Sequence, residues 1–181
     1  MDPKRMKWNE SQKILRQALS RPERHAEAVA LFLGQHAMVH TAEVSGIGRT
    51  TFEDDVWDGL EDAAARCIPP GCEHSIAWCF WHLTRIEDVT MNILLAGTPQ
   101  LLFRERWFEK MNVPYQDTGN GMPPVDVARL GAVIDLPALR AYRLAVGRRT
   151  REIVPASSPD DLRRKVDPAR IERILAEGAV T

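Results

Sequence analysis

The 181-residue chain has little of several features that define common protein classes. Its three cysteines, Cys67, Cys72 and Cys79, cannot all pair with one another, which favours a reducing cytoplasm over a secreted, disulfide-stabilised protein. No apolar run reaches the roughly 18 residues that a membrane helix needs. The charged first residues, MDPKRMKWNESQK, contain no apolar segment of a secretory signal. A net charge of −1 provides no general attraction to nucleic acid.

Sequence patterns for several folds and catalytic sites are also missing. We find no alternating apolar and polar run long enough for a strand, no internal repeat, and no P-loop, GxGxxG, GxSxG or HExxH motif. Apolar residues at helical spacing extend instead over most of the chain. The sequence therefore predicts an all-α fold, with residues 1–181 forming a single helical domain.

The strongest predicted helix covers residues 75–96. Ser75 caps its start, Gly97 supplies the left-handed residue after its end, and the Thr98-Pro99 step blocks continuation. One stripe of this helix is apolar apart from a single imidazole, and it consists of Ser75, Trp78, Cys79, His82, Ile86, Val89 and Ile93. We expect this stripe to face the core, with His82 largely buried at its centre.

The other predicted helices differ widely in length. Two are long, at 23–44 and 136–154, and the shorter ones are at 9–19, 51–66, 98–111, 124–130, 158–165 and 168–177. A bundle buries the apolar stripes of four long helices against one another. Because no fourth long stripe follows residue 154, we expect the fourth bundle helix to be missing or replaced. Either the chain is truncated at its C-terminal end, or a second subunit covers the open groove.

Histidines provide the best candidate for a functional site. His36 and His40 are four residues apart, so both imidazoles lie on one face of a helix, a common arrangement for two metal ligands. If that helix packs beside the central one, His82 completes a three-nitrogen site with an open position, suited to zinc, nickel or ferrous iron. Two alternatives stay open: His82 is a hydrogen-bonded core residue, or His40 is exposed at its helix end.

Other polar residues have simpler interpretations. Cys67, Cys72, His74 and Cys79 lack the CxxC spacing of a zinc cluster, and we expect them to be structural. The run that contains Arg85, Glu87 and Asp88 favours ion pairing, with Asp88 and Asn92 as an i,i+4 polar pair. Acid–base catalysis by Glu87 or Asp88 is the alternative. The arginines of 140–173 favour a solvated face over phosphate binding, because acids lie between them.

The residues of the central helix resemble a known family signature, and several other segments extend the similarity. The run SIAWCFWHLTRIEDVTMNILLAG at 75–97 resembles the signature helix of the DinB/YfiT-like superfamily. The resemblance extends to HAMVH at 36–40, TTFEDDVWDGL at 50–60, TGNGM at 118–122 and AYRLAVGRRTREI at 141–153.

The resemblance implies a DinB-like four-helix bundle, often a homodimer, that holds a divalent metal ion by three histidines. His82 matches the motif histidine, and His40 or His36 matches the histidine of the first long helix. No histidine follows His82 to match the ligand of the last bundle helix. Characterised members are metal-dependent thiol transferases or isomerases that act with low-molecular-weight thiols.

We therefore expect a cytoplasmic metal-dependent (thiol) transferase or hydrolase that acts on a small molecule. The metal ligands would be His36, His40 and His82, and the ion zinc, nickel or iron. We expect no nucleic-acid or membrane partner. The alternative is a non-enzymatic helical dimerisation protein with a vestigial metal site.

Overall fold

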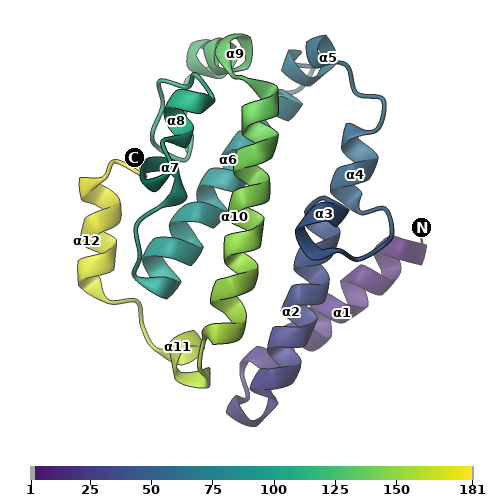
Figure 1. Cartoon of the computed structure of the whole chain (residues 1–181), viewed down its shortest axis with the longest axis vertical. Coiled ribbons are helices and arrows are strands. Elements are labelled where there is room, and N and C mark those ends of the chain that lie inside the picture. The colour runs from purple at the N-terminus through teal and green to yellow at the C-terminus, as the bar shows by residue number, and fades with distance from the viewer. Residues whose placement is uncertain (1–2, 181) are drawn as a thin grey trace. The chain divides into compact units, whose positions relative to one another are not determined.

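The computed structural model describes residues 3–180, with side chains from residue 5 onward, and these residues form helices and loops without a strand (Figure 1). The all-α prediction is confirmed. The chain divides into two compact units, each described by itself. Unit 1 comprises Met1–Asp58 and Arg151–Lys165, and unit 2 comprises Gly59–Thr150 and Val166–Thr181. Among the described residues, no helix is long and apolar enough to cross a membrane.

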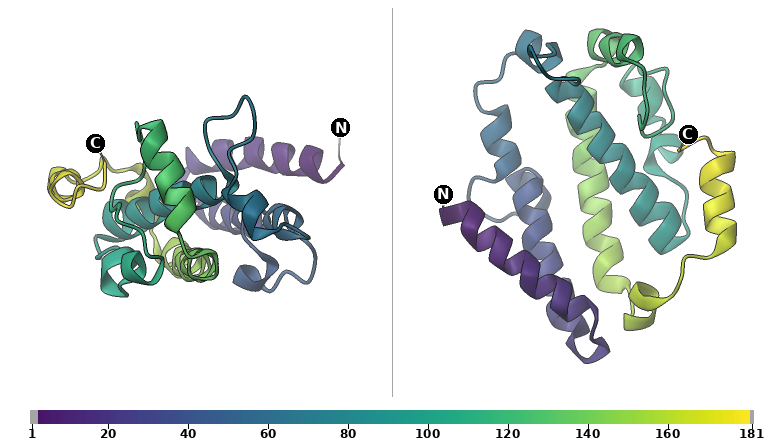
Figure 2. Two further views of the ribbon diagram at one scale, coloured as in Figure 1. Left: turned by 90° about the horizontal axis from the view of Figure 1, so that it is seen from above. Right: turned by 180° about the vertical axis from the view of Figure 1, so that it is seen from behind.

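Unit 1 begins with a hairpin of two long helices. Helix α1 covers Pro3–Leu19, and the 3-10 turn η1 at Pro22–Arg24 leads into α2 at His25–Val39. The two helices lie side by side, as the views of Figures 1 and 2 show. Their shared core contains Leu15, Ala18, Ala28, Leu31 and Phe32. The predicted helix at 9–19 was too short, because the charged residues before it carry no apolar period.

The predicted helix at 23–44 ends earlier than expected. Helix α2 stops at Val39, and His40 has an extended backbone with φ −118° and ψ 164°. A separate turn of helix, α3, covers Ala42–Ser45 and ends at Gly46, whose φ of 66° is accessible to glycine at little cost. No proline or glycine marks the break at residue 40, so the sequence gives no signal for it.

The segment predicted as one helix at 51–66 is two helices. Helix α4 covers Phe52–Trp57, and a capping box between Thr51 and Asp54 starts it as predicted. Helix α5 covers Asp62–Arg66 and belongs to unit 2.

Unit 1 is completed by a segment from much later in the chain. Helix α10 covers Leu136–Ala156, and its last turns belong to unit 1, as does α11 at Pro159–Arg163. The Arg151 guanidinium donates to the carbonyl oxygen of Leu33 at 3.0 Å. His25 Nε2 donates to the carbonyl oxygen of Ser157 at 2.9 Å. These bonds attach the late segment to α2.

Unit 2 is organised around the predicted central helix. Helix α6 covers Ile76–Asp88 and continues without a break into η2, a π-helix over Val89–Ala96. The Ser75 hydroxyl accepts from the Trp78 amide at 3.1 Å, and Gly97 has a φ of 70°, so both predicted ends are confirmed. The π winding was not predicted.

The C-terminal helix α12 at Pro168–Ala176 covers part of η2. Ile174 and Ala179 form an apolar cluster with Val89 and Ile93, and Leu94 and Val180 pack against it. This short helix therefore provides apolar cover for the end of the central helix within unit 2.

The predicted core stripe of the central helix is partly wrong. Trp78, Val89 and Ile93 are buried, but Cys79 is exposed and Ile86 is 38 % exposed. Leu83 is also exposed, whereas Trp81 is fully buried. The helix is apolar nearly all round, so the pattern alone does not select which face its neighbours cover.

The remaining elements of unit 2 are short. The predicted helix at 98–111 is divided into α7 at Leu101–Arg104 and α8 at Trp107–Lys110, with Arg106 in the left-handed region at φ 56°. The predicted long loop follows and ends at α9, Pro124–Val133. Asp135 then caps α10, as its carboxylate accepts from the Ala138 amide at 2.8 Å.

Candidate functional site

Two histidines meet at the end of α2 in unit 1. His36 lies in the last turn of the helix and His40 directly follows it, and both are buried. Their rings stack with centroids 4.2 Å apart, and Phe32 stacks on the other side of His36 at 5.8 Å. A ring nitrogen of each histidine lies within 4.8 Å of one from the other. The predicted pairing of the two imidazoles therefore holds although His40 is not helical, and the alternative of an exposed His40 is wrong.

The third predicted ligand, His82, belongs to an aromatic stack in unit 2. Trp78 lies between His74 and His82, with ring centroids at 3.7 Å and 4.6 Å. The half-buried His82 ring is also held by a short hydrogen bond between Nδ1 and the carbonyl oxygen of Thr118. A carbonyl oxygen can only accept, so Nδ1 donates to it, and Nε2 is the ring nitrogen left to bind a metal. This is the arrangement of a histidine that binds a metal through Nε2 with its other nitrogen fixed by a carbonyl.

The loop that carries Thr118 lies close against the central helix because it contains a glycine. Gly119 has a φ of 82°, and a Cβ at this position would lie 2.5 Å from the Trp81 ring. Its amide donates to the Asp117 carboxylate at 2.6 Å, which closes a tight turn. Residues of the TGNGM segment thus position the carbonyl that orients His82.

A fully buried arginine fixes the other end of this loop. Arg85 donates to the carbonyl oxygens of Gln116 at 2.7 Å and Asp117 at 3.3 Å. Its Nη1 also donates to the Tyr142 hydroxyl at 3.1 Å and lies 3.5 Å from the Asp88 carboxylate. The predicted ion pairing in this run is confirmed for Arg85 and Asp88.

Asp88 organises the start of α7. Its two carboxylate oxygens accept from the amides of Leu101 and Leu102, both at 2.9 Å. Asn92 Nδ2 donates to the same carboxylate at 2.8 Å, as the i,i+4 spacing predicted, and the Tyr142 hydroxyl donates at 2.6 Å. Asp88 is completely buried with these partners, so the structure favours its structural role over the acid–base alternative.

The pKa of the Tyr142 phenol is raised well above its usual value of 10. Burial is the largest cause, and the neighbouring Asp88 carboxylate adds to it, while Arg85 acts in the opposite direction. The phenol is therefore held as a neutral donor to Asp88. The local sequence pattern indicates Arg85, Asp88 and Asn92 but not Tyr142, which is 54 residues from Asp88 in the chain.

The three cysteines lie at the surface of the protein. Cys67, Cys72 and Cys79 are all exposed free thiols, so the expectation that Cys79 faces the core was wrong. Partial burial still raises the pKa of the Cys79 thiol, and the nearby Cys72 raises it further. A raised pKa keeps a thiol protonated and lowers its nucleophilicity.

A comparison with family models matches residues 54–180 to the DinB superfamily. The chain belongs to the DinB superfamily. The match covers well over half of the sequence and includes His82, the Arg85–Asp88 pair and Tyr142. His36 and His40 precede the matched residues. A comparison with curated proteins finds no match.

The side chains that this DinB-superfamily chain offers are compatible with a divalent metal ion. His36 and His40 present two imidazole nitrogens at short range inside unit 1. Imidazole binds zinc, nickel and iron. The sharing of one ion by His36, His40 and His82 stays a prediction.

Proposed function

We propose that this DinB-superfamily protein holds a divalent metal ion through His36 and His40 and acts as a metal-dependent transferase or hydrolase. The observation that carries the proposal is the stacked, buried pair of imidazoles at the end of α2. Zinc, nickel and ferrous iron all accept nitrogen ligands of this kind. A metal in such a site lowers the pKa of a bound thiol or water, which then becomes a nucleophile near neutral pH.

We propose His82 of α6 as the third ligand, as the sequence predicts. His82 matches the family motif, and its hydrogen bond to the carbonyl oxygen of Thr118 occupies Nδ1 and leaves Nε2 as the ring nitrogen for a metal. Metal-binding histidines are usually oriented by such a second hydrogen bond.

The substrate class follows from the family rather than from a shaped cavity. We propose a small electrophilic substrate together with a low-molecular-weight thiol, a homodimeric protein, and a cytoplasmic location that keeps the three exposed thiols reduced. Neither nucleic acid nor a membrane is part of the proposal.

Metal content tests the proposal directly. Protein purified without a metal-affinity tag is expected to contain about one zinc, nickel or iron ion per chain by elemental analysis. His36→Ala and His40→Ala should each reduce this content to background, and a loss of metal in His82→Ala would identify His82 as the third ligand. His74→Gln is the matched control, because His74 stacks on Trp78 but is no proposed ligand. An unchanged metal content in the His36→Ala/His40→Ala double variant would contradict the proposal.

A second candidate function is a non-enzymatic dimerisation protein with a vestigial metal site. It is favoured by two exposed apolar side chains on α6, Leu83 at 52 % and Ile86 at 38 %, which are one turn apart. Sedimentation of metal-free protein separates the two functions. Two results together would favour this second function. The purified protein would contain no stoichiometric metal, and it would form a metal-free dimer that Leu83→Glu dissociates.

A further inference from the structure

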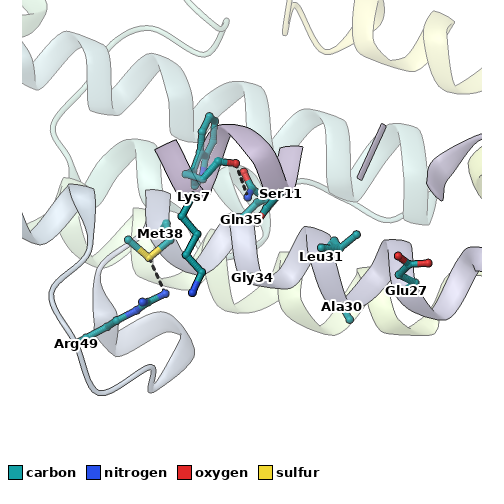
Figure 3. Close-up of a pocket in the computed structure, with 10 residues that line it drawn as sticks. Lys7, Ser11, Glu27, Ala30, Leu31, Gly34, Gln35, Met38 and Arg49 are labelled. Atoms are coloured by element: carbon teal, nitrogen blue, oxygen red, sulfur yellow. Dashed lines mark hydrogen bonds between the residues drawn. The ribbon is translucent and has the colours of Figure 1, made fainter. Parts of the chain in front are cut away.

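The hairpin of unit 1 contains a pocket that the proposed metal function does not use. The pocket has a volume of about 390 Å³ and lies between α1, α2 and the segment that follows α3 (Figure 3). Apolar lining is supplied by Trp8, Ala30, Leu31 and Met38. Small-molecule sites have volumes of roughly 300–1,000 Å³ and are mostly apolar with a few polar groups.

Two cations lie at one end of this pocket. Lys7 of α1 and Arg49 of the segment after α3 reach the same end in the view of Figure 3, while Glu27 lies at the opposite end. The Arg49 guanidinium donates a hydrogen bond to the thioether sulfur of Met38 at 3.5 Å, and a thioether sulfur is a weak acceptor. Within the described part of the chain, neither cation forms an ion pair.

The acid at the other end of the pocket is already neutralised. Both carboxylate oxygens of Glu27 accept from the Arg24 guanidinium, at 2.7 Å and 2.6 Å. This pair lowers the pKa of Glu27, so the carboxylate stays ionised and engaged with Arg24. The unbalanced charge in the pocket is therefore positive and is located at the end that holds Lys7 and Arg49.

Two buried polar atoms in the lining have no hydrogen-bond partner among the described residues. They are the indole Nε1 of Trp8, which can donate, and the amide Oε1 of Gln35, which can accept. Gln35 Nε2 donates to the backbone oxygen of Trp8 at 3.1 Å, and this bond fixes which end of the amide presents oxygen. Buried polar groups of this kind are rarely left unpaired in native proteins, so both atoms are available to a bound molecule.

A glycine in the middle of α2 keeps this pocket open. Gly34 lines it, and a Cβ built at this position meets no atom within 4 Å. Glycine is less favourable than alanine inside a helix, and no neighbouring side chain or backbone requires its small size here. A larger side chain at residue 34 would occupy the volume that a ligand needs.

We propose that this pocket binds a small organic carboxylate with an apolar or aromatic body. Lys7 and Arg49 hold the carboxylate, and the apolar body lies along Trp8, Leu31 and Met38 beside Gly34. Charge-assisted hydrogen bonds from a guanidinium to a carboxylate are stronger than neutral ones, and they explain the preference for an anion. The site lies entirely within unit 1 and does not depend on metal binding.

Calorimetric titration of the full chain with three probes of one shape tests the proposal. Phenylacetate is expected to bind saturably and at least about tenfold more tightly than uncharged phenylacetamide, and phenethylamine should not bind. Arg49→Gln and Lys7→Gln should each weaken phenylacetate binding by about three- to tenfold. Gly34→Leu should abolish it, with far-UV circular dichroism showing that the helix is retained. Lys13→Gln is the matched control on α1, because Lys13 is exposed, pairs with Glu10 and lies outside the pocket.

Three outcomes of the probe and Gly34→Leu titrations would overturn the proposal, and a fourth comes from the control variant. They are equal affinity for the charged and uncharged probes, phenylacetate binding that Gly34→Leu leaves unchanged, and no saturable phenylacetate binding at dissociation constants below about 1 mM. Loss of binding in Lys13→Gln to the same extent as in Arg49→Gln would also overturn it, because the effect would then follow net charge rather than the pocket.

Discussion

Two arginines, one in each unit, show how differently the same side chain is used. Arg85 in unit 2 is fully buried and donates to two backbone carbonyls and the Tyr142 hydroxyl beside the Asp88 carboxylate. Arg49 in unit 1 is exposed, and the bond that the structure gives it is to a methionine sulfur. A buried guanidinium has to be satisfied by the fold itself, whereas an exposed one beside an apolar pocket is available to a ligand.

The same contrast extends to the polar groups around each arginine. Around Arg85, the carboxylate of Asp88 accepts from two amides, an amide side chain and a phenol. Around Arg49, the lining of the pocket keeps Trp8 Nε1 and Gln35 Oε1 buried with no partner among the described residues. We call the fully hydrogen-bonded groups around Arg85 and Asp88 the saturated cluster, and we infer that it holds the loop and α7 in place. The groups around Arg49, which include two polar atoms without a partner, form the proposed binding site.

The largest expected effect comes from disrupting the saturated cluster. Asp88→Ala removes the acceptor of four hydrogen bonds and leaves the Arg85 guanidinium buried without its counter-charge. Loss of one partner of a buried ion pair costs about 3–5 kcal/mol, and we expect this reduction in the free energy of unfolding from urea denaturation. Glu172→Ala on the exposed face of α12 is the control, with a change within about 0.5 kcal/mol. If the two variants reduced the free energy of unfolding by similar amounts, the groups around Arg85 would not have the structural role that we assign to them.

The pH dependence of stability sharpens the comparison at Tyr142. Its pKa is raised in the folded state, so the unfolded phenol loses its proton above about pH 10 while the folded one retains it. The stabilisation is therefore fully present below pH 10 and is lost as the pH rises through the folded pKa, at about 1.4 kcal/mol per pH unit. Alkaline denaturation followed by circular dichroism checks this. The Tyr142→Phe variant should not show this part of the loss of stability with rising pH. If the free energy of unfolding fell with pH at the same slope in both proteins, Tyr142 would not titrate as a buried phenol.

The smallest expected effect is a gain of stability in unit 1. Gly34→Ala replaces a helix-interior glycine at a position where the added Cβ meets no atom within 4 Å. We expect a gain of about 1 kcal/mol and a rise in melting temperature of about 2–4 °C, measured by thermal unfolding. Gly46→Ala is the contrasting variant, because its φ of 66° makes any other residue unfavourable. Destabilisation by Gly34→Ala would mean that the glycine is required by the fold rather than by the pocket.

The central helix and its polar cluster were the most predictable parts of the chain. Ser75 and Gly97 define the ends of residues 75–96 by local chemistry, and the spacing of Asp88 and Asn92 predicts their contact on any helix. Interactions within one or two turns need no knowledge of the rest of the fold. Tyr142 and the carbonyls of Gln116 and Asp117 come from distant segments, so no local pattern identifies them as partners of Arg85.

The faces and ends of several helices were less predictable. Cys79 and Ile86 follow the same apolar period as Trp78 and Val89, yet Cys79 and Ile86 are exposed. The helix has several apolar faces, and the neighbouring segments cover only some of them. Helix α2 ends before His40 without a glycine or proline to mark it. Of the candidate site, the proximity of His36 and His40 was predicted from their spacing, whereas the stacking of Trp78 between two histidines was not.

The order in which the chain is synthesised bears on how unit 1 is completed. Its hairpin is made first, but the segment that bonds to α2 arrives much later: Arg151 is 118 residues from Leu33, and Ser157 is 132 residues from His25. At about 5–20 residues per second, the hairpin waits on the order of ten seconds for that segment, while most of unit 2 is synthesised in between. Closing so long a loop is slow compared with forming a helical hairpin. During this interval the nascent α1–α2 hairpin depends on its own small core of Leu15, Ala18 and Ala28, so it is open to chaperones and proteases before the late segment arrives.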